Sequence, residues 1–424
     1  MSLTPYKILS HILSPFIVST LWLKDKDSAK QRLGNLPKKI IKKAPFDLWM
    51  HGVSVGEIGV VKAIYDEFKI INPDAKIVIS SFTDTGIKRA NEIFDKNQPI
   101  IYYPVDIPLA VKKSVNLIKP RLYCAVETEL WPNLLFFLKK KGTKLALLNG
   151  RISPSSFKKY KKISFFMKEV LALFDQICVI SPKDKERFVA LGARKERISI
   201  CGNAKFEALL KAPSLEKHQK IHEKFSLPSK RPIIVAGSIR GKEHREVISA
   251  LLDLKREGLN PILILVPRHL ERVSTIESYL KEKGLFYMLF SKFERSNNLE
   301  ELDVILIDRI GLLFDLYALC DLAFIGGSLI PKGGQNLMEP AAWQKPVLFG
   351  PYFYNFQDAG ELLLEKKGGF LVKNKEELYK TFKILLKKRE LRVEAGVNAR
   401  KALEELGRGA ASRQARVLEH LLNE

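Results

Sequence analysis

The sequence predicts an α/β protein made of two doubly wound domains, each with a parallel sheet covered by helices on both faces. Short, almost continuously apolar runs recur from residue 46 onward, and strands of a sheet that is buried on both faces have this composition. Helical patterns separate these runs, which favours βαβ units. The runs form two series, and 424 residues are enough for two or three domains.

The two series of apolar runs define the expected domain boundaries. The runs of the first series are FDLWMHGVS, KIVISSF, RLYCAVE, KLALLN, QICVIS and ISICGN, and those of the second are PIIVAGS, PILILVPRH, DVILID, LAFIGGS and PVLFG. A charged stretch with two prolines interrupts the rhythm between them and is predicted to be a linker. The predicted parts are a segment 1–45, a first Rossmann-like domain 46–206, a linker 207–231, a second Rossmann-like domain 232–390 and C-terminal helices 391–424.

Charge and cysteine content narrow the possible partners and compartment. Lysine and arginine exceed the acidic residues by 24, which indicates an anionic partner: nucleic acid, an anionic membrane surface or a phosphorylated substrate. No recognisable nucleic-acid module is present, so nucleic acid is disfavoured. The four cysteines have no CxxC spacing and lie in apolar runs. They are predicted to be buried thiols in a reducing compartment.

The first 45 residues are expected to associate with a membrane. Residues Ile8 to Leu23 are mostly apolar, although the run is short for a bilayer crossing, which needs roughly 20 residues. Basic residues are dense between Lys24 and Lys43 and include Arg32. By the positive-inside rule this flank places the body of the protein on the cytoplasmic side. The alternative is an amphipathic first helix that packs on the core.

Carboxylates follow two strands of the first series, where the strands of a doubly wound sheet present ligand-binding residues. Glu57 comes after HGVSVG and falls in the first turn of the next helix. It is either a favourable charge at a helix N-terminus or a general base. Glu127 and Glu129 follow RLYCAV, ahead of Trp131 and Pro132. They suit either a sugar-binding acid cluster or ordinary helix N-terminal chemistry.

The second series ends its strands in glycine, arginine and small polar residues. Ser238 and Arg268 each follow a strand, and arginine can pair with a phosphate or carboxylate. A glycine-rich stretch, GGQNLMEP at 333–340, follows GGSL at 326–329. Such a turn entering a helix predicts an anion site, with Glu339 placed to accept from ribose hydroxyls. Neither GxxxxGK[ST] nor a GxGxxG after a first strand occurs, which disfavours P-loop nucleotidases and dinucleotide dehydrogenases.

Motifs spread in order over most of the chain resemble those of 3-deoxy-D-manno-oct-2-ulosonic acid (Kdo) transferases of lipid A and lipopolysaccharide core biosynthesis. The matching stretches are HGVSVGE (51–57), ETELWPN (127–133), NGRIS (149–153), GNAKF (202–206), GSIRGKE (237–243), VPRHLER (266–272), GGSL (326–329), GGQNLMEPAAW (333–343) and GPYFYNFQD (350–358). The sequence departs from the usual family pattern at Arg240, Gln335 and Leu312.

The resemblance implies an inverting glycosyltransferase with a GT-B fold, in which two Rossmann-like domains face a cleft. It also implies an N-terminal membrane-associated helix. Domain 46–206 would bind the acceptor, a lipid A precursor, and domain 232–390 would bind the donor, CMP-Kdo. The reaction would take place at the cytoplasmic face of the inner membrane, without a metal or other cofactor. Glu57 would be the general base and Glu127 an essential acid. The residues implied for the donor are Ser238, Pro267, Arg268, Ile310, Gly311, Gly334, Gln335, Asn336 and Glu339.

One other enzyme class and one further surface follow from the sequence. A nucleotide-sugar epimerase can share this two-domain architecture and is the alternative function. The stretch FKKYKKISFFMK, Phe157 to Lys168, interleaves aromatic residues with lysines, which is typical of an interfacial helix. Together with the N-terminal run it is predicted to meet an anionic membrane surface; the alternative is a helix whose aromatics pack on the domain.

Overall fold

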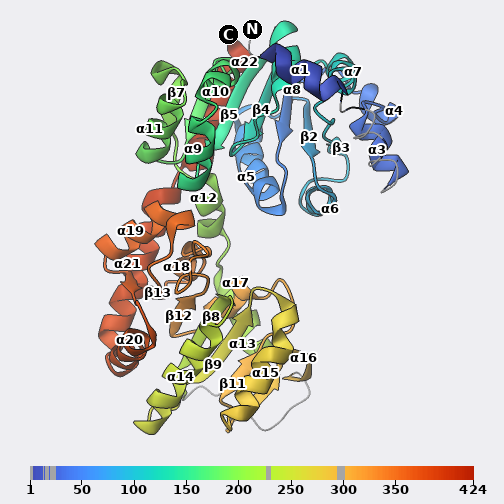
Figure 1. Ribbon diagram of the computed structural model, residues 1–424. Coiled ribbons are helices and arrows are strands. Elements are labelled where there is room, and N and C mark those ends of the chain that lie inside the picture. Colours follow the sequence, from blue (N-terminus) through green and yellow to red (C-terminus); the bar gives the residue numbers. More distant parts are fainter. Residues whose placement is uncertain (1–2, 13, 15–18, 20–24, 226–230, 294–300) are drawn as a thin grey trace. The chain divides into compact units, whose positions relative to one another are not determined.

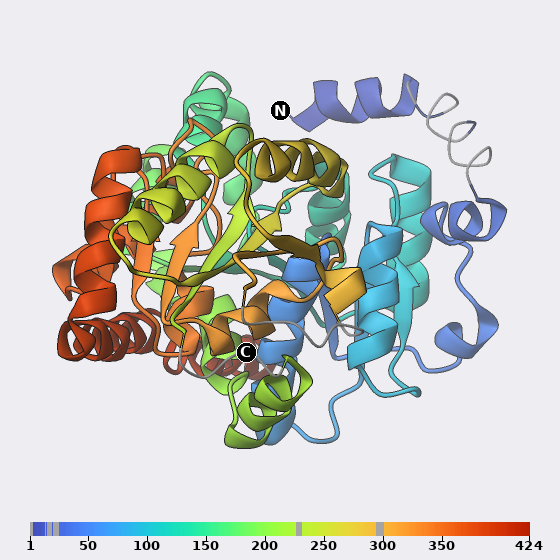
Figure 2. The ribbon, with the colours of Figure 1, turned by 90° about the horizontal axis from the view of Figure 1, so that it is seen from below.

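The computed structural model describes residues 3–12, 14, 19, 25–225, 231–293 and 301–424. It consists of two compact units: unit 1 joins the residues up to Ala208 with Gly409–Glu424, and unit 2 is Leu209–Arg408. Figures 1 and 2 show the course of the chain, in which α20 and α21 of unit 2 lie side by side.

Unit 1 contains a seven-stranded sheet with the order β3-β2-β1-β4-β5-β6-β7. Each described strand pair in it is parallel, with Leu48 of β1 opposite Leu122 of β4. Its strands are β1 (Leu48–His51), β2 (Ile77–Ser81), β3 (Ile100–Tyr102), β4 (Leu122–Val126), β5 (Lys144–Gly150), β6 (Gln176–Val179) and β7 (Ile198–Ile200).

Most helices of unit 1 connect these strands, and several begin at a serine or threonine that caps the first turn. Ser54, Thr83, Ser153 and Ser181 each accept a hydrogen bond from a backbone N–H of the helix that follows. The helices are α1 (Leu3–Ile12), α3 (Lys26–Arg32), α4 (Lys38–Ile41), α5 (Val55–Ile71), α6 (Asp84–Ile93), α7 (Pro108–Ile118), α8 (Pro132–Lys140), α9 (Pro154–Lys161), α10 (Ser164–Leu171), α11 (Pro182–Ala190), α12 (Ala204–Lys211) and α22 (Ala410–Asn423).

Unit 2 contains a second parallel sheet, with the order β10-β11-β9-β8-β12-β13-β14. Its strands are β8 (Ile233–Ile239), β9 (Ile262–Pro267), β10 (Tyr287–Leu289), β11 (Val304–Leu306), β12 (Leu322–Ile325), β13 (Val347–Phe349) and β14 (Gly369–Leu371). Its helices are α13 (Leu215–Phe225), α14 (Glu243–Arg256), α15 (Val273–Glu282), α16 (Phe290–Phe293), α17 (Leu313–Leu319), α18 (Met338–Ala342), α19 (Gln357–Glu365), α20 (Lys375–Lys387) and α21 (Arg389–Gly407).

The two parallel sheets confirm the predicted α/β class, and each predicted apolar run contains a strand. The sequence did not indicate β3, β10 and β14. Each of these has three residues and lies at an edge of its sheet.

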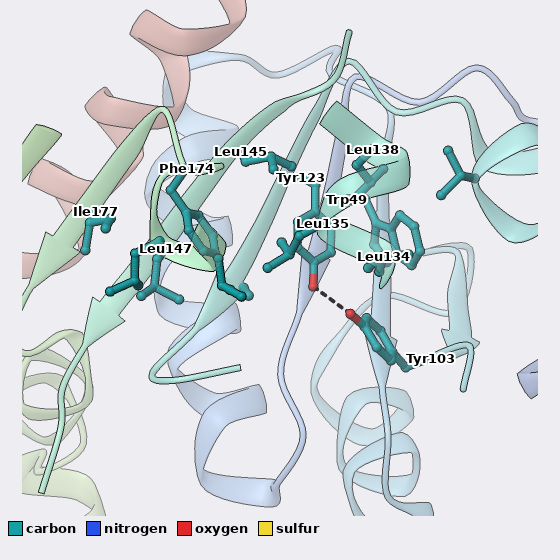
Figure 3. Packing of buried hydrophobic residues seen from close by; sticks show 14 of the residues in the cluster. Trp49, Tyr103, Tyr123, Leu134, Leu135, Leu138, Leu145, Leu147, Phe174 and Ile177 are labelled. Atoms are coloured by element: carbon teal, nitrogen blue, oxygen red, sulfur yellow. Dashed lines mark hydrogen bonds between the residues drawn. The ribbon is translucent and has the colours of Figure 1, made fainter. Parts of the chain in front are cut away.

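The core of unit 1 lies on both faces of its sheet because successive strand residues point to opposite sides. Trp49 of β1 joins the cluster beneath α8 and α10, whereas Leu48 and Met50 join the cluster on the opposite face. In the first cluster the hydroxyls of Tyr103 and Tyr123 are 3.1 Å apart (Figure 3). All four cysteines of the chain are described, and each is a buried free thiol, as predicted.

The predicted C-terminal helices, 391–424, are divided between the two units. Helix α21 belongs to unit 2, whereas α22 returns to unit 1 and packs on α5. Alanines and leucines of α22 are buried with α5 in one cluster, and Gln414 accepts a hydrogen bond from the backbone N–H of Asn149, 2.7 Å away. The predicted linker, 207–231, holds the end of α12 and all of α13; its residues 226–230 lie outside the described part.

Much of the predicted apolar run from Ile8 to Leu23 also falls outside the described residues, namely residues 13, 15–18 and 20–23. The part that is described belongs mainly to α1. Within the described residues, the model contains no helix with the length and hydrophobicity that a membrane crossing requires.

Replacing Leu418 by alanine should destabilise unit 1, because Leu418 is fully buried between α22 and α5. Deleting a buried leucine side chain typically lowers the free energy of unfolding by about 2–5 kcal/mol. Guanidinium unfolding followed by circular dichroism measures the change. Arg416→Ala, at an exposed position of the same helix, is the control. Equal stability of the two variants would contradict the packing of α22 on unit 1.

Candidate functional site

Each sheet changes the direction of its strand order beside its first strand, and many of the predicted site residues lie at these reversals. In unit 1 the reversal falls between β1 and β4, and in unit 2 between β8 and β12. Neighbouring helices leave a doubly wound sheet in opposite directions at this point, which opens a crevice beyond the carboxyl ends of the strands. Glu57 follows β1 and Glu127 follows β4. Ser238 lies near the end of β8, and Gly326 follows β12.

Glu57 is the third residue of α5, and its carboxylate folds back over the helix start. One carboxylate oxygen accepts from the backbone N–H of Val53 and the other from the hydroxyl of Ser54, both at 2.8 Å. The Ser54 oxygen in turn accepts from the N–H of Glu57 at 3.3 Å, which completes a capping box. Burial raises the pKa of Glu57, and the charge of Glu127 raises it further, while the hydrogen bonds lower it. The Glu57 carboxylate is therefore bonded at the start of the helix, and its pKa lies above the usual value.

Glu127 and Asn149 hold left-handed backbone conformations directly beyond β4 and at the end of β5, with φ of 63° and 51°. The Glu127 carboxylate lies 3.2 Å from Nε of Arg151. The hydroxyl of Thr128 donates to the backbone carbonyl of Arg151. The NGRIS stretch thus supplies a cation at this edge of the sheet.

Glu129 is a third carboxylate of this group. It accepts from the indole Nε1 of Trp131 at 2.9 Å, and the Trp131 ring stacks on Phe82 with centroids 5.5 Å apart. Burial raises the pKa of Glu129 to about 7; the charge of Glu57 adds to the shift and the Trp131 hydrogen bond opposes it. The sequence suggested a second acid beside Glu127, but its titration near neutral pH depends on burial that no motif reveals.

A hollow of about 460 Å³ adjoins the first turn of α5 and the start of α6. Lys88 and Arg89 provide cationic groups along it, and Arg89 also pairs with Glu92 at 3.3 Å. Gly56 and Gly59 form the α5 side of the hollow. Its shape and charge suit an anionic group next to the helix that carries Glu57.

In unit 2 the ends of β8 and β12 approach so closely that only glycine fits at position 326. A side chain there would meet the backbone oxygen of Ser238 at 2.5 Å. Ser238 itself has a φ of 54°. The N–H of Gly334 donates to the carbonyl of Gly327 at 2.8 Å, which holds the GGQN stretch against the GGSL stretch.

The structure brings together Ser238, Gly334, Gln335, Asn336 and Glu339 around the glycine-rich turn. Helix α18 begins only at Met338 and has five residues, so the GGQN residues form a loop. The Asn336 side chain accepts from the N–H of Met338 and donates to Glu339, both at 3.1 Å. The glycine-rich turn thus enters a helix at Met338, and the side chain of Asn336 organises the turn.

Glu243, at the start of α14, holds this loop region in place. This role was not predicted from the sequence. The buried carboxylate of Glu243 accepts from the backbone N–H groups of Arg240, Gly327, Ser328 and Leu329 at 2.6–3.0 Å. Burial raises the pKa of Glu243, and these backbone hydrogen bonds lower it. Glu243 ends the GSIRGKE stretch and begins α14. This position could have indicated an acid that binds the backbone of a neighbouring loop.

The remaining predicted donor residues lie beyond neighbouring strands. Pro267 ends β9, and Arg268 is exposed with its backbone N–H bonded to the carbonyl of Ile239 at 3.0 Å. Ile310 is 87% exposed and precedes Gly311, whose φ is 93°. Among the described residues, no group of three or more histidines, cysteines or acids is arranged to hold a metal ion.

Comparison with known proteins shows to which family the chain belongs. The family model described as 3-deoxy-D-manno-octulosonic-acid transferase (kdotransferase) matches residues 27–208. A 3-deoxy-D-manno-octulosonic acid transferase of Aquifex aeolicus is 33% identical over 84% of this chain and 91% of its own length. The chain belongs to the Kdo transferase family. Family members are glycosyltransferases, so the chain is an enzyme of that class.

Two further relatives agree with this membership. The Kdo transferase of Haemophilus influenzae is 31% identical over 86% of the chain and 82% of its own length. A bifunctional glycosyltransferase/methyltransferase of Fusobacterium nucleatum is 39% identical over 80% of the chain. The match spans about half, 52%, of that bifunctional relative. These sequence relatives favour a transferase over the epimerase that the sequence left as the alternative.

Solved structures share the fold of this Kdo transferase family member. A glycosyltransferase from Rickettsia africae has a TM-score of 0.60 at 16% identity, covering 90% of this chain and 99% of the other. A UDP-bound Anabaena protein has a TM-score of 0.59 at 17% identity, with 89% and 99% covered. The two-domain architecture expected of a GT-B enzyme is thereby supported at the level of the fold.

Fluorescence of Trp131 should report the protonation of Glu129. Below pH 7 the Glu129 carboxylate gains a proton, and the hydrogen bond from the Trp131 indole loses its charged acceptor. Tryptophan emission is expected to change with a midpoint near pH 7, and a fluorescence titration of the intact protein measures this change. The change should be absent in Glu129→Gln and in Trp131→Phe. Persistence of the same transition in Glu129→Gln would assign it to another group.

Proposed function

We propose that this protein transfers Kdo from CMP-Kdo to a lipid A precursor, with inversion at the anomeric carbon. The observation that carries the proposal is the membership of the Kdo transferase family combined with a carboxylate, Glu57, at the strand-order reversal of unit 1. A carboxylate with a raised pKa at such a crevice suits proton removal from an attacking hydroxyl.

In the proposed reaction a hydroxyl of the acceptor attacks the anomeric carbon of Kdo while the bond from that carbon to the CMP phosphate breaks. The hydroxyl proton passes to Glu57, and the electron pair of the broken bond leaves with CMP. The hydrogen bonds from Val53 and Ser54 hold the carboxylate in one orientation, and each carboxylate oxygen retains a further lone pair for the proton. Glu127, beside Arg151, would orient the acceptor.

The proposed donor residues lie in unit 2. The exposed guanidinium of Arg268 would neutralise charge that develops on the phosphate of CMP, and Asn336 and Glu339 offer polar groups for the nucleotide. CMP carries one phosphate and is already a good leaving group. We therefore expect transfer to proceed without a bound metal.

The acceptor lipid carries phosphates, and unit 1 offers cations for them. The hollow beside α5 presents Lys88 and Arg89 next to the helix that carries Glu57. A phosphate bound there would fix the lipid headgroup relative to the base, since a guanidinium or ammonium pairs well with phosphate. Part of the net charge of +24 would serve this purpose.

Helices α1, α9 and α10 form the proposed membrane-facing surface. The stretch from Phe157 to Lys168 is two helices rather than the single interfacial helix expected, and Phe157, Tyr160 and Phe166 pack against the core. Phe165, however, is 70% exposed and Ile163 also faces solvent. The Phe166 ring lies 5.8 Å from that of Tyr6, so α1 and α10 are neighbours.

The charges of this surface come from exposed lysines. Lys158, Lys159, Lys161 and Lys162 lie exposed around Ile163 and Phe165. Arg32 does not contribute, although the sequence analysis counted it with the basic flank: it is buried, with its guanidinium 4.8 Å from the ring centroid of Phe82. We propose that the surface binds the anionic cytoplasmic face of the inner membrane through these lysines and the exposed apolar side chains.

Incubation of the protein with CMP-Kdo and a tetraacylated lipid A precursor, followed by mass spectrometry, tests the proposed reaction. The expected product has the mass of the acceptor plus Kdo, and CMP is released. Absence of product, with the acceptor dispersed in detergent and the protein folded, would refute the proposal.

Replacing Glu57 by glutamine should reduce turnover by at least about 100-fold, because the amide cannot accept the proton. Steady-state assays with detergent-dispersed acceptor measure the effect. CMP binding and the melting temperature should change little. Asp66→Asn, at an exposed position on the same helix that pairs with Lys62, is the matched control and should retain activity. Near-normal turnover of Glu57→Gln would remove Glu57 from the reaction.

Replacing Lys158, Lys159, Lys161 and Lys162 together by glutamine should weaken binding to anionic liposomes by about 100-fold or more at low salt, since each lysine near such a surface contributes about 1 kcal/mol. Liposome sedimentation measures the binding. The control removes the same charge from exposed positions of unit 2, at Lys281, Lys283, Lys387 and Lys388. Equal binding of the first variant and the wild type would exclude α9 and α10 from the membrane contact.

A further inference from the structure

Helix α1 has two faces that differ in what they contact. Ile8 and Ile12 are 56% and 66% exposed and lie four residues apart, on one side of the helix. Tyr6 and Ser10, also four residues apart, point into unit 1, where α1 contacts α7, α8 and α10. Figure 1 shows α1 next to α7 and α8.

The inward face of α1 makes hydrogen bonds to two residues of the body. The Tyr6 hydroxyl donates to the Asp106 carboxylate at 2.9 Å. The side-chain nitrogen of Asn133 donates to the Ser10 hydroxyl at 2.9 Å and to the backbone carbonyl of Asp106 at 2.6 Å. Asp106, Asn133 and Ser10 are buried, so these polar contacts are shielded from water and depend on one another.

Asp106 caps helix α8 from another part of the chain. Its two carboxylate oxygens accept from the backbone N–H groups of Asn133 at 3.0 Å and Leu134 at 2.8 Å. These are among the first N–H groups of the helix, which need an acceptor from outside it. Trp131 occupies the N-cap position, and an indole provides no acceptor oxygen. The carboxylate of Asp106 supplies what the local sequence lacks.

The start of α8 is continuous with the acidic loop of the candidate site. Trp131 precedes the first helical residue, Pro132, and its indole donates to Glu129. The orientation of the α8 start therefore determines where Trp131 and Glu129 lie. The oxygen of Asp106 that accepts from Asn133 is the same one that accepts from Tyr6.

We propose that Tyr6 and Ser10 of α1, acting through Asp106 and Asn133, position the Glu127–Trp131 loop for acceptor binding. These four residues form a latch between the N-terminal helix and the acceptor site. Tyr6 and Ser10 are positioning residues, because they act on the loop through Asp106 and the start of α8. The helix thus has a role in the active site in addition to any contact with lipid, and its outward face remains available for the bilayer. The expected effect on the acceptor KM rests on the proposed function, whereas the expected effect on the structure of the loop does not.

Tyr6→Phe tests the latch while leaving Asp106 and the ring contact with Phe166 in place. Tyr65→Phe is the matched control: it removes one tyrosine hydroxyl in the same unit, 2.9 Å from the Gln98 side chain. Loss of a hydrogen bond to a charged group corresponds to about a tenfold effect. With detergent-dispersed acceptor we expect the acceptor KM of Tyr6→Phe to rise by about that factor, with the donor KM unchanged. Tyr65→Phe should keep both constants.

Hydrogen–deuterium exchange measured by mass spectrometry gives a readout that is independent of activity. In Tyr6→Phe and in Tyr6→Phe/Ser10→Ala the amides of residues 127–140 should exchange faster than in the wild type and in Tyr65→Phe. Faster exchange without any Kdo transfer by the wild type would refute the proposed function and support the latch. Unchanged exchange, or unchanged acceptor KM in an active enzyme, would overturn the positioning role.

Discussion

The reversal of strand order in each parallel sheet is the constraint on which the rest of the site depends. Between β1 and β4, and between β8 and β12, adjacent strands send their helices to opposite faces, so the loops beyond them diverge. Backbone and side chains must fill the space that this divergence leaves. In unit 1 it holds carboxylates, Glu57 and Glu127, and in unit 2 glycine-rich loops around Gly326 and Gly334. The chemical difference between the units therefore lies in their loops and not in their sheets.

Buried and half-buried carboxylates hold these loops by accepting backbone N–H groups. Glu57 accepts from Val53, Asp106 accepts from two residues of α8, and Glu243 gathers four N–H groups around the GGSL loop. Charge-assisted hydrogen bonds of this kind are stronger than neutral ones and more specific in geometry. Burial raises the pKa of Asp106 to about 6 and that of Glu57 and Glu243 above their usual values. The backbone hydrogen bonds oppose this upward shift in each case.

The sequence was sufficient for the fold and for the candidate residues, but not for the contacts between distant segments. Apolar runs located the long strands because a buried parallel strand needs many consecutive apolar residues. The positions of Glu57 and Glu127 followed from the rule that ligands bind beyond strand ends. The return of α22 to unit 1 and the capping of α8 by Asp106 depend on partners 265 and 27 residues away in sequence. No local pattern specifies such partners.

Three non-glycine residues at strand ends hold strained backbone conformations. Glu127, Asn149 and Ser238 have φ between 51° and 63°, in the left-handed region that non-glycine residues seldom occupy. Asn149 compensates by accepting the N–H of Ala204 at 2.9 Å, while its own N–H is bonded to Gln414. Glu127 is bonded to Arg151 and projects from the reversal in unit 1. A glycine would remove the strain at each position but also the side chain. The strain costs about 1–3 kcal/mol for each residue, and the side chains of Glu127 and Asn149 offset part of it through their hydrogen bonds with Arg151 and Ala204.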